Sequence, residues 1–293
     1  MKICFGNKIL TKNGYKSVEE ISLKDQLITQ SGSYQKIIGI RELNYRGFQY
    51  KLFTKFHHDG ILFADGESIW VRNRVKIRGQ IMNLEMMRKG IEEIRQEDFI
   101  GMIINSNSRI PRFLANREEY FYMIGYFMGN GWLETYSDKF EIYFTISDWE
   151  VERKIGIVLP IRLDGYFWCE NMQWYNILKD FVKGMPEWIQ DLPQNLVKSF
   201  IDGYEKSMEC KKRNHLTREQ AMGLQRLYLK IRRIVSVQLK NGLRIIKEPK
   251  RTVAFIDGNY VWYPITRIGM EEVNMEIKYL QLNGAVVMEN ILC

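Results

Sequence analysis

The feature that most constrains the fold is a β-rich pattern that a long helical stretch interrupts. Residues 4 to about 105 alternate short apolar runs with turn signals such as Asn13-Gly14 and Asp65-Gly66. The same pattern returns from Thr252 to the end of the chain. Because surface loops with neighbouring ends tolerate whole inserted domains, we expect one all-β domain that a second domain interrupts.

Strands are predicted in both flanks of the chain. Those of the first flank are residues 8–11, 25–29, 36–40, 49–53 and 68–71, and those of the second are 252–256, 260–268 and 274–288. The spacing within each flank is short, which is typical of a compact β unit.

The middle block predicts helices over residues 115–128, 173–181, 194–208 and 217–234, with another helix opening at Ser147. Thr217 with Gln220 three residues later has the spacing of a capping box. A strand at 140–146 and a hairpin of 235–239 with 243–247 complete the block. The order helix, strands, helices occurs twice, so we expect two duplicated α+β halves, and an α+β class for the whole protein.

Charge is concentrated in one segment. The chain has a formal net charge of +8, yet residues 210–251 alone hold 13 basic and 2 acidic residues, 13 − 2 = +11, which leaves 8 − 11 = −3 elsewhere. Such a segment favours a polyanionic partner, and a solvated helix face is the alternative.

Composition excludes several classes of protein. Hydrophobic residues make up 45% of the chain and no apolar run is long enough for a membrane span, so we expect a globular protein without a membrane partner. The cysteines Cys4, Cys169, Cys210 and Cys293 have no metal-binding spacing. We therefore expect reduced thiols, an intracellular location and no metal site.

Residues 4–11, 18–21 and 25–29 resemble the first block of inteins and related Hint domains. Residues 93–101 are similar to a later strand-turn segment of that family. The resemblance implies a horseshoe-shaped Hint domain formed by residues 1–108 and 252–293.

The middle block resembles the LAGLIDADG homing endonucleases. Residues 122–132 (YMIGYFMGNGW) look like the first motif helix, and residues 183–189 with 200–204 look like the approach to the second. The resemblance implies a pseudo-two-fold domain over residues 109–251. Its motif helices would pack Gly125 and Gly129 against Gly203 and Ser207.

In that family each motif helix offers one carboxylate to a divalent metal ion near the scissile phosphate, since hard cations need anionic oxygen ligands. The two acid positions are Asn130 and Met208 in this sequence, and Glu209 lies one residue, about 100°, further around the helix. We expect metal-dependent cleavage to be lost. The alternative is an active, Mg²⁺-dependent endonuclease that uses Glu209 with another acid such as Asp202.

The N-terminal splicing positions are also altered. Cys4 occupies the position of the thioester-forming nucleophile. The activating Thr-x-x-His block aligns with residues 64–67, where Ala64 and Glu67 replace both working residues. A competing alignment uses Thr54 and His57, which have the right spacing but lie early in the chain.

At the C-terminus Asn290 corresponds to the cyclising asparagine. Glu289 replaces the preceding histidine, Ile291 has no acyl-accepting group, and Cys293 lies two residues too late. With three residues before Cys4 and three after Asn290, we expect splicing to be lost.

We therefore expect an intein-derived, homing-endonuclease-like protein that binds nucleic acid, without a cofactor. Its predicted contacts are Lys139, Lys211, Lys212, Arg213, Arg226, Lys230, Arg232 and Arg233, with Glu141 and Tyr143 beside Lys139 on the same strand. Double-stranded DNA is the expected partner. RNA, as for a maturase-like factor, and a protein partner in a large assembly are alternatives. A cytoplasmic or nucleoid-associated protein of phage or mobile-element origin fits this expectation.

Overall fold

The computed structural model describes residues 2–12, 14–28, 34–56, 60–77, 80–83, 85–106, 108–146, 148–164, 166–209, 216–240, 243–249, 253–282 and 291–292. The chain is α+β, and every pairing among the described strands is antiparallel. It divides into two compact units, residues 1–104 with 248–293 (unit 1) and residues 105–247 (unit 2). The boundaries expected from the sequence, 108/109 and 251/252, each lie four residues further along.

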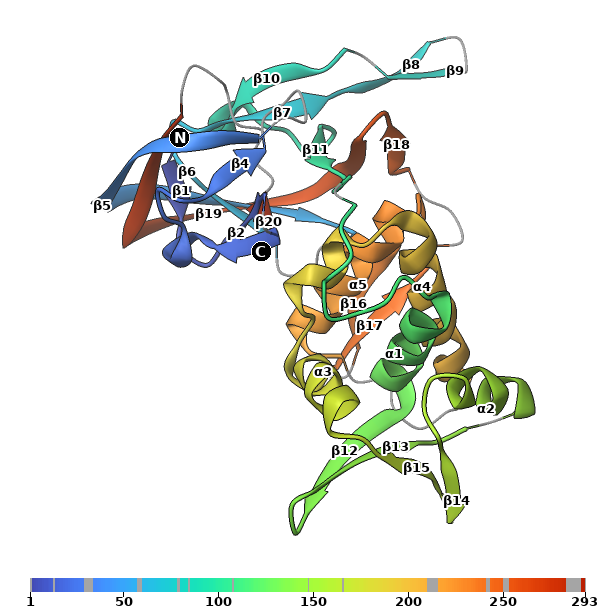
Figure 1. The fold of residues 1–293 in the computed structure, drawn as a ribbon. Helices are drawn as coiled ribbons and strands as arrows, with labels where there is room; N and C mark the ends of the chain where they lie inside the picture. Colours follow the sequence, from blue (N-terminus) through green and yellow to red (C-terminus); the bar gives the residue numbers. More distant parts are fainter. Residues whose placement is uncertain are drawn as a thin grey trace. The chain divides into compact units, whose positions relative to one another are not determined.

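Unit 1 consists of strands joined by turns (Figure 1). The strands are β1 Lys2–Cys4, β2 Lys8–Thr11, β3 Gly14–Ser17, β4 Gln26–Ile28, β5 Tyr34–Thr54, β6 Ile61–Ala64, β7 Ser68–Arg72, β8 Arg74–Ile77, β9 Gln80–Asn83, β10 Met87–Gly90, β11 Phe99–Ile103, β18 Phe255–Asp257, β19 Tyr260–Leu282 and β20 Ile291–Leu292. Short 3₁₀ turns lie at Val18–Glu20 and Ile91–Glu93.

Both ends of the chain contribute to the same sheet in unit 1. Its path is β10-β7-β11-β19-β5-β4-β2-β20, with β1 and β18 on β19, β3 on β2 and β6 on β5. The C-terminal strand β19 therefore pairs with β11, β5 and β1 from the N-terminal flank, as the matching patterns at both ends predict.

The sequence prediction was wrong about the lengths of two strands. Residues 36–40 and 49–53 belong to one 21-residue strand, β5, and residues 260–268 and 274–282 belong to the 23-residue β19. The polar residues between the apolar runs look like a break in each pattern. They stay in strand conformation because β5 and β19 pair with each other along almost their whole length, from Ile265 opposite Thr54 to Leu282 opposite Ile37.

Unit 2 contains five α-helices and six strands among the described residues (Figure 1). In chain order they are α1 Glu118–Asn130, β12 Gly131–Tyr136, β13 Lys139–Phe144, α2 Trp149–Gly156, β14 Arg162–Asp164, β15 Tyr166–Glu170, α3 Met172–Lys183, a 3₁₀ turn Glu187–Asp191, α4 Gln194–Met208, α5 Arg218–Lys230, β16 Ser236–Lys240 and β17 Leu243–Lys247. The four-stranded sheet has the order β12-β13-β15-β14, and β16 with β17 forms a hairpin.

One apolar core holds unit 2 together. Helix residues such as Phe121, Leu178 and Phe200 pack with Ile142 and Phe144 of the sheet, and all of these side chains are buried. Because residues alternate faces along a strand, the neighbours of Ile142 on β13 point to the other side of the sheet. The sheet thus has one face on the helices and one face turned away from them.

The predicted duplication of unit 2 is only partly correct. The first half follows its long helix α1 directly with strands, whereas in the second half the described strands come after α5. The sequence prediction also omitted β12, β14 and β15. Within the described part of the chain, no helix has both the length and the apolar character needed to cross a membrane.

Candidate nucleic-acid interface

Helices α1 and α4 approach each other through glycines on both sides. A β-carbon added to Gly125 would lie closer than 3.0 Å to the carbonyl oxygen of Phe200, and one added to Gly203 would lie equally close to that of Tyr122. Tyr122 precedes Gly125 by three residues, and Phe200 precedes Gly203 by three. The contact is therefore reciprocal, as a local two-fold axis between the helices requires.

A third small-residue contact follows the same relation. Gly129 faces the Ser207 hydroxyl, and a β-carbon at Gly129 would overlap that oxygen. The offsets agree, because 203 − 125 = 78 and 207 − 129 = 78. The expected packing of Gly125 and Gly129 against Gly203 and Ser207 is present in the structure. In this register Asn130 corresponds to Met208.

Asn130 ties the two helix ends together. It is the last residue of α1, only 4% exposed, and its Nδ2 donates a hydrogen bond to the Ser207 carbonyl oxygen at 3.0 Å. An ionised aspartate could not donate this bond, and its charge would face the same carbonyl oxygen. The amide thus serves helix packing at this position.

The end of α4 carries an apolar side chain and an exposed carboxylate in place of the amide at the end of α1. Met208 is partly buried and packs on the apolar core of unit 2. Glu209 is exposed and accepts a hydrogen bond from Lys206 at 2.7 Å. The same Lys206 ammonium lies 3.0 Å from Asp148, the N-cap of α2. The Lys206 ammonium therefore bridges the carboxylates of Asp148 and Glu209.

The residues present do not fit a divalent metal ion. Asp202 and Glu209 are seven residues apart on α4, about 10 Å along the helix axis, too far to ligate one ion at 2.3–2.6 Å. Among the described residues no group of three or more His, Cys, Asp or Glu side chains is arranged to hold a metal. The structure thus gives no support to the alternative that pairs Glu209 with Asp202.

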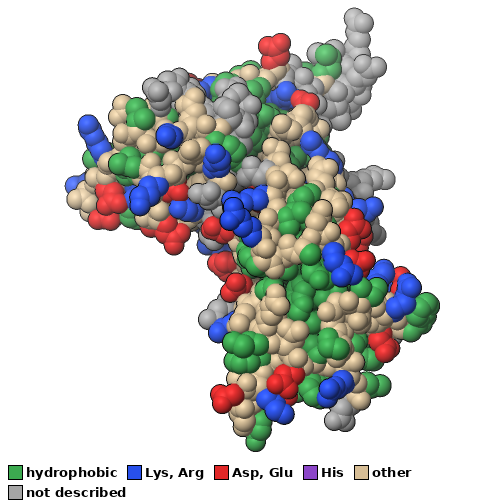
Figure 2. Space-filling model, in the orientation of Figure 1, with side chains coloured by type: hydrophobic (Ala, Val, Ile, Leu, Met, Phe, Trp, Pro, Cys, Tyr) green, Lys and Arg blue, Asp and Glu red, His purple; other side chains and the backbone are tan. Residues whose placement is uncertain are grey.

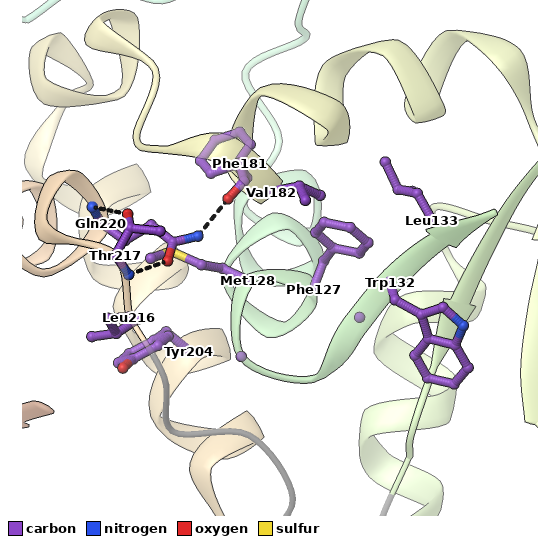
Figure 3. A pocket seen from close by; sticks show the side chains of 12 residues that line it. Phe127, Met128, Trp132, Leu133, Phe181, Val182, Tyr204, Leu216, Thr217 and Gln220 are labelled. Carbon is purple, nitrogen blue, oxygen red and sulfur yellow. Dashed lines mark hydrogen bonds between the residues drawn. The ribbon is translucent and has the colours of Figure 1, made fainter. Parts of the chain in front are cut away.

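A pocket of about 270 Å³ lies beside the end of α1 (Figure 3). Its walls are mainly aromatic and aliphatic, among them Phe127, Trp132, Phe181 and Tyr204. Gln220 and Thr217 already bond within the protein, since they form a capping box and Gln220 also donates to the Phe181 carbonyl oxygen. None of the described residues that line it has a charged side chain.

The face of the four-stranded sheet turned away from the helices is aromatic and acidic. Trp132, Tyr143 and Trp168 lie opposite one another on β12, β13 and β15. The next cross-strand row on this face is Glu134, Glu141 and Glu170. Two exposed cations accompany these acids, namely Lys139 where β13 begins and Arg162 on β14.

The predicted basic contacts differ in how exposed they are. Lys211, Lys212 and Arg213 lie outside the described residues. Lys139 and Arg232 are exposed. Arg226 is half-buried, and Arg233 is half-buried with its guanidinium 2.7 Å from Glu205. Figure 2 shows basic and acidic side chains mixed on the face it presents.

Lys230 is not a surface contact, and this part of the prediction was wrong. It is 4% exposed and its ammonium donates to the Gln190 carbonyl oxygen at 2.9 Å. Burial lowers the pKa of Lys230 to about 8. Spacing on α5 could not reveal this, because Lys230 is buried by packing against the distant Glu187–Asp191 turn.

In unit 1 the predicted nucleophile Cys4 lies in an apolar cluster. It is fully buried with Ala64, Tyr45 and Ile277. Cys4 and Ala64 are thus brought together, as the alignment with residues 64–67 expects. Thr54 lies at the end of β5 and accepts a bond from the Phe56 amide. His57, Glu289, Asn290 and Cys293 lie outside the described residues.

Tyr45 is a polar neighbour of Cys4 that the sequence prediction omitted. Its hydroxyl donates to the Phe48 carbonyl oxygen at 2.7 Å and accepts from the Asp65 amide at 3.1 Å. Burial raises the pKa of Tyr45, and the side chain of Asp65 raises it further. A phenol held neutral in this way cannot act as a base toward a thiol at neutral pH.

No protein-family model matches the chain, and no curated protein matches it either.

Proposed function

We propose that this protein derives from an intein-borne LAGLIDADG endonuclease and binds nucleic acid without cleaving it or splicing. The observation that carries the proposal is the reciprocal glycine contact between α1 and α4. Helices with alanine or larger residues at these positions could not approach as closely. The split of unit 1 around unit 2 is the second support.

The loss of chemistry rests on the helix ends and on Cys4. Asn130 bonds the neighbouring helix, Met208 packs on the core, and Lys206 already bridges Asp148 and Glu209. Cys4 is fully buried beside Ala64, whose methyl group cannot activate a thiol. These contacts support neither an active endonuclease nor an active splicing element.

We assign binding to the segment 210–251, whose formal charge of +11 becomes 11 − 1 = +10 without the buried Lys230. Phosphate contacts release counterions, so each contact contributes about −0.9 to the slope of log affinity against log salt for duplex DNA. Double-stranded DNA is the first candidate ligand and RNA the second.

The proposal can be tested by fluorescence anisotropy with labelled duplex DNA and RNA over a range of salt concentrations. The combined Lys211→Ala, Lys212→Ala and Arg213→Ala variant should reduce the magnitude of the DNA slope by up to about 2.7. The matched control, with the same loss of charge, changes the exposed residues Lys12, Lys24 and Lys55 of unit 1 to alanine. Its slope should stay close to that of the native protein.

Two outcomes would contradict the proposal. The native protein could bind neither ligand at low salt, or both variants could change the slope equally. Incubation with Mg²⁺ or Mn²⁺ should leave duplex DNA intact, and cleavage would restore the active endonuclease as the better description.

A further inference from the structure

The pocket beside the end of α1 has walls that the core of unit 2 already holds in place (Figure 3). Phe127, Phe181 and Tyr204 line it and are each 3% exposed or less. Phe127 packs edge-to-face on Phe144, with 6.0 Å between ring centroids. Phe181 packs in the same way on Trp188 at 5.8 Å. These walls are therefore formed before any ligand arrives, as is usual for small-molecule sites.

The pocket is accessible and large enough for a small molecule. Val182 is 52% exposed and Thr217 is exposed, so solvent reaches the pocket where these residues line it. Its volume of about 270 Å³ exceeds the roughly 150 Å³ of a cavity that holds benzene, so two fused rings fit. Aromatic rings gain more from aromatic walls than the buried area alone provides. Size and lining therefore favour an uncharged aromatic ligand.

One polar group of the pocket, the hydroxyl of Tyr204, has no hydrogen bond to any described residue. Gln220 and Thr217, in contrast, bond to each other in the capping box. Burial raises the pKa of Tyr204, so its hydroxyl keeps the proton at neutral pH and is available as a donor. A buried donor without an acceptor is costly, and a ligand that supplies the acceptor removes that cost.

The two-fold relation between α1 and α4 shows which partner this hydroxyl lacks. Tyr126 corresponds to Tyr204, because 204 − 126 = 78, the offset of the reciprocal glycines. The Tyr126 hydroxyl donates to the Thr145 carbonyl oxygen at 2.8 Å, directly after β13. Among the described residues α4 is followed by α5, so no strand brings such a carbonyl to Tyr204. The second half therefore has a pocket and a donor where the first half has its own backbone.

From this geometry we infer that the pocket binds a small uncharged heteroaromatic molecule of one or two rings, which accepts a hydrogen bond from Tyr204. The aromatic walls supply the contact area, and the hydroxyl selects for a ring that carries an acceptor. The inference is independent of the proposed nucleic-acid binding.

Quinoline and naphthalene are a matched pair of probes for the test. Both have two fused rings, and only quinoline has a ring nitrogen that accepts a hydrogen bond. Equilibrium dialysis of the full-length protein, with ultraviolet absorbance of the ligand, measures both affinities. We expect saturable binding of quinoline to one site, with a dissociation constant below about 1 mM for a ligand of this size.

The variant Tyr204→Phe removes the donor and keeps the ring. It should weaken quinoline binding about fivefold, the effect of one hydrogen bond, and leave naphthalene binding within about twofold. A role of Tyr204 in packing alone would not distinguish the two probes.

The variant Val182→Trp fills the pocket from an exposed position. It should weaken both probes at least tenfold, because the larger side chain takes the space of the ligand. The matched control is Val253→Trp in unit 1, since Val253 is also 52% exposed. The control should bind both probes within about twofold of the native protein.

Three outcomes overturn the inference. The native protein could fail to bind quinoline saturably, Val182→Trp could bind it as well as Val253→Trp does, or Tyr204→Phe could weaken both probes equally. Thermal unfolding checks that each variant is folded and gives a second readout. Quinoline should raise the unfolding midpoint of the native protein and of Val253→Trp, and it should leave that of Val182→Trp unchanged.

Discussion

The two halves of unit 2 share one helix contact but differ in their strands. Gly125 of the first half and Gly203 of the second each face a carbonyl oxygen of the opposite helix. The first half adds a four-stranded sheet, whereas the second adds the β16–β17 hairpin. Close backbone contact allows only glycine at both positions, while a solvent-facing sheet edge tolerates change. The comparison teaches that the helix contact is symmetric whereas the strands around it are not.

The largest expected effect comes from the reciprocal glycines. Gly125→Ala and Gly203→Ala should each lower the free energy of unfolding by about 3 kcal/mol, because the added methyl group forces the helices apart. Gly156→Ala on α2 is the control, since a β-carbon there meets nothing within 4 Å. Urea unfolding measures all three. A loss confined to one of the two motif glycines would break the symmetry argument.

The corresponding residues at the two helix ends are Asn130 and Met208. The variant Asn130→Asp tests what the Asn130 amide contributes to stability. The variant should lose about 2 kcal/mol at pH 7, because its buried carboxylate faces the Ser207 carbonyl oxygen. Burial there should raise the pKa of the new aspartate above its unfolded value, so the loss should shrink as the pH falls toward 4.

Asn130→Ala is the control for this pH dependence, since alanine loses the same hydrogen bond without a titrating group. Its deficit should be constant between pH 4 and pH 7. Stabilisation of Asn130→Asp by millimolar Mg²⁺ would contradict the view that the end of α4 cannot complete a metal site.

Lys230 of the second half provides a pH test at higher pH. Its pKa of about 8 lies below the value of about 10.4 in the unfolded chain. Between these values the unfolded chain binds more protons, so the free energy of unfolding should rise with pH, by about 2 kcal/mol from pH 8 to pH 10. The difference between native protein and Lys230→Met, measured in urea, isolates this contribution. The exposed Lys247→Met should retain the rise, and its persistence in Lys230→Met would disprove the assignment.

The smallest effect concerns how helices end in each half. Helix α3 ends at Gly184, whereas α5 is followed by Arg232 with φ of 63°, in the left-handed region. The Arg233 amide bonds back to the Tyr228 carbonyl oxygen at 2.9 Å, as in a Schellman motif. Arg232→Gly should therefore raise the free energy of unfolding by up to about 1 kcal/mol. An unchanged or lower value, measured by thermal unfolding, would count against strain at Arg232.

Local signals in the sequence predicted several elements correctly. The predicted helix 194–208 coincides with α4, and the capping box of Thr217 and Gln220 is present at the start of α5. The small-residue contacts of the helix pair were also predictable, because glycine spacing on a helix fixes which residues share a face. The alternation in residues 131–136 and 166–170 could have revealed β12 and β15 as well.

Other features depend on residues far apart in the chain. β5 and β19 are each continuous through a polar stretch because each supplies the other's hydrogen-bond partners, and no local pattern encodes that pairing. Lys230 is a second example of a long-range effect. Its charge predicts a surface position, but packing against the distant Glu187–Asp191 turn buries it.

The sequence by itself determined the α+β composition, the glycine positions of the helix pair and the absence of acids at Asn130 and Met208. Only the tertiary structure decided what those side chains do instead, namely that Asn130 bonds to Ser207 and Met208 packs on the core. It also decided that three glutamates share one row of the outward sheet face. Residue identity and short-range periodicity are written in the chain, whereas burial and cross-strand register arise only when distant segments pack together.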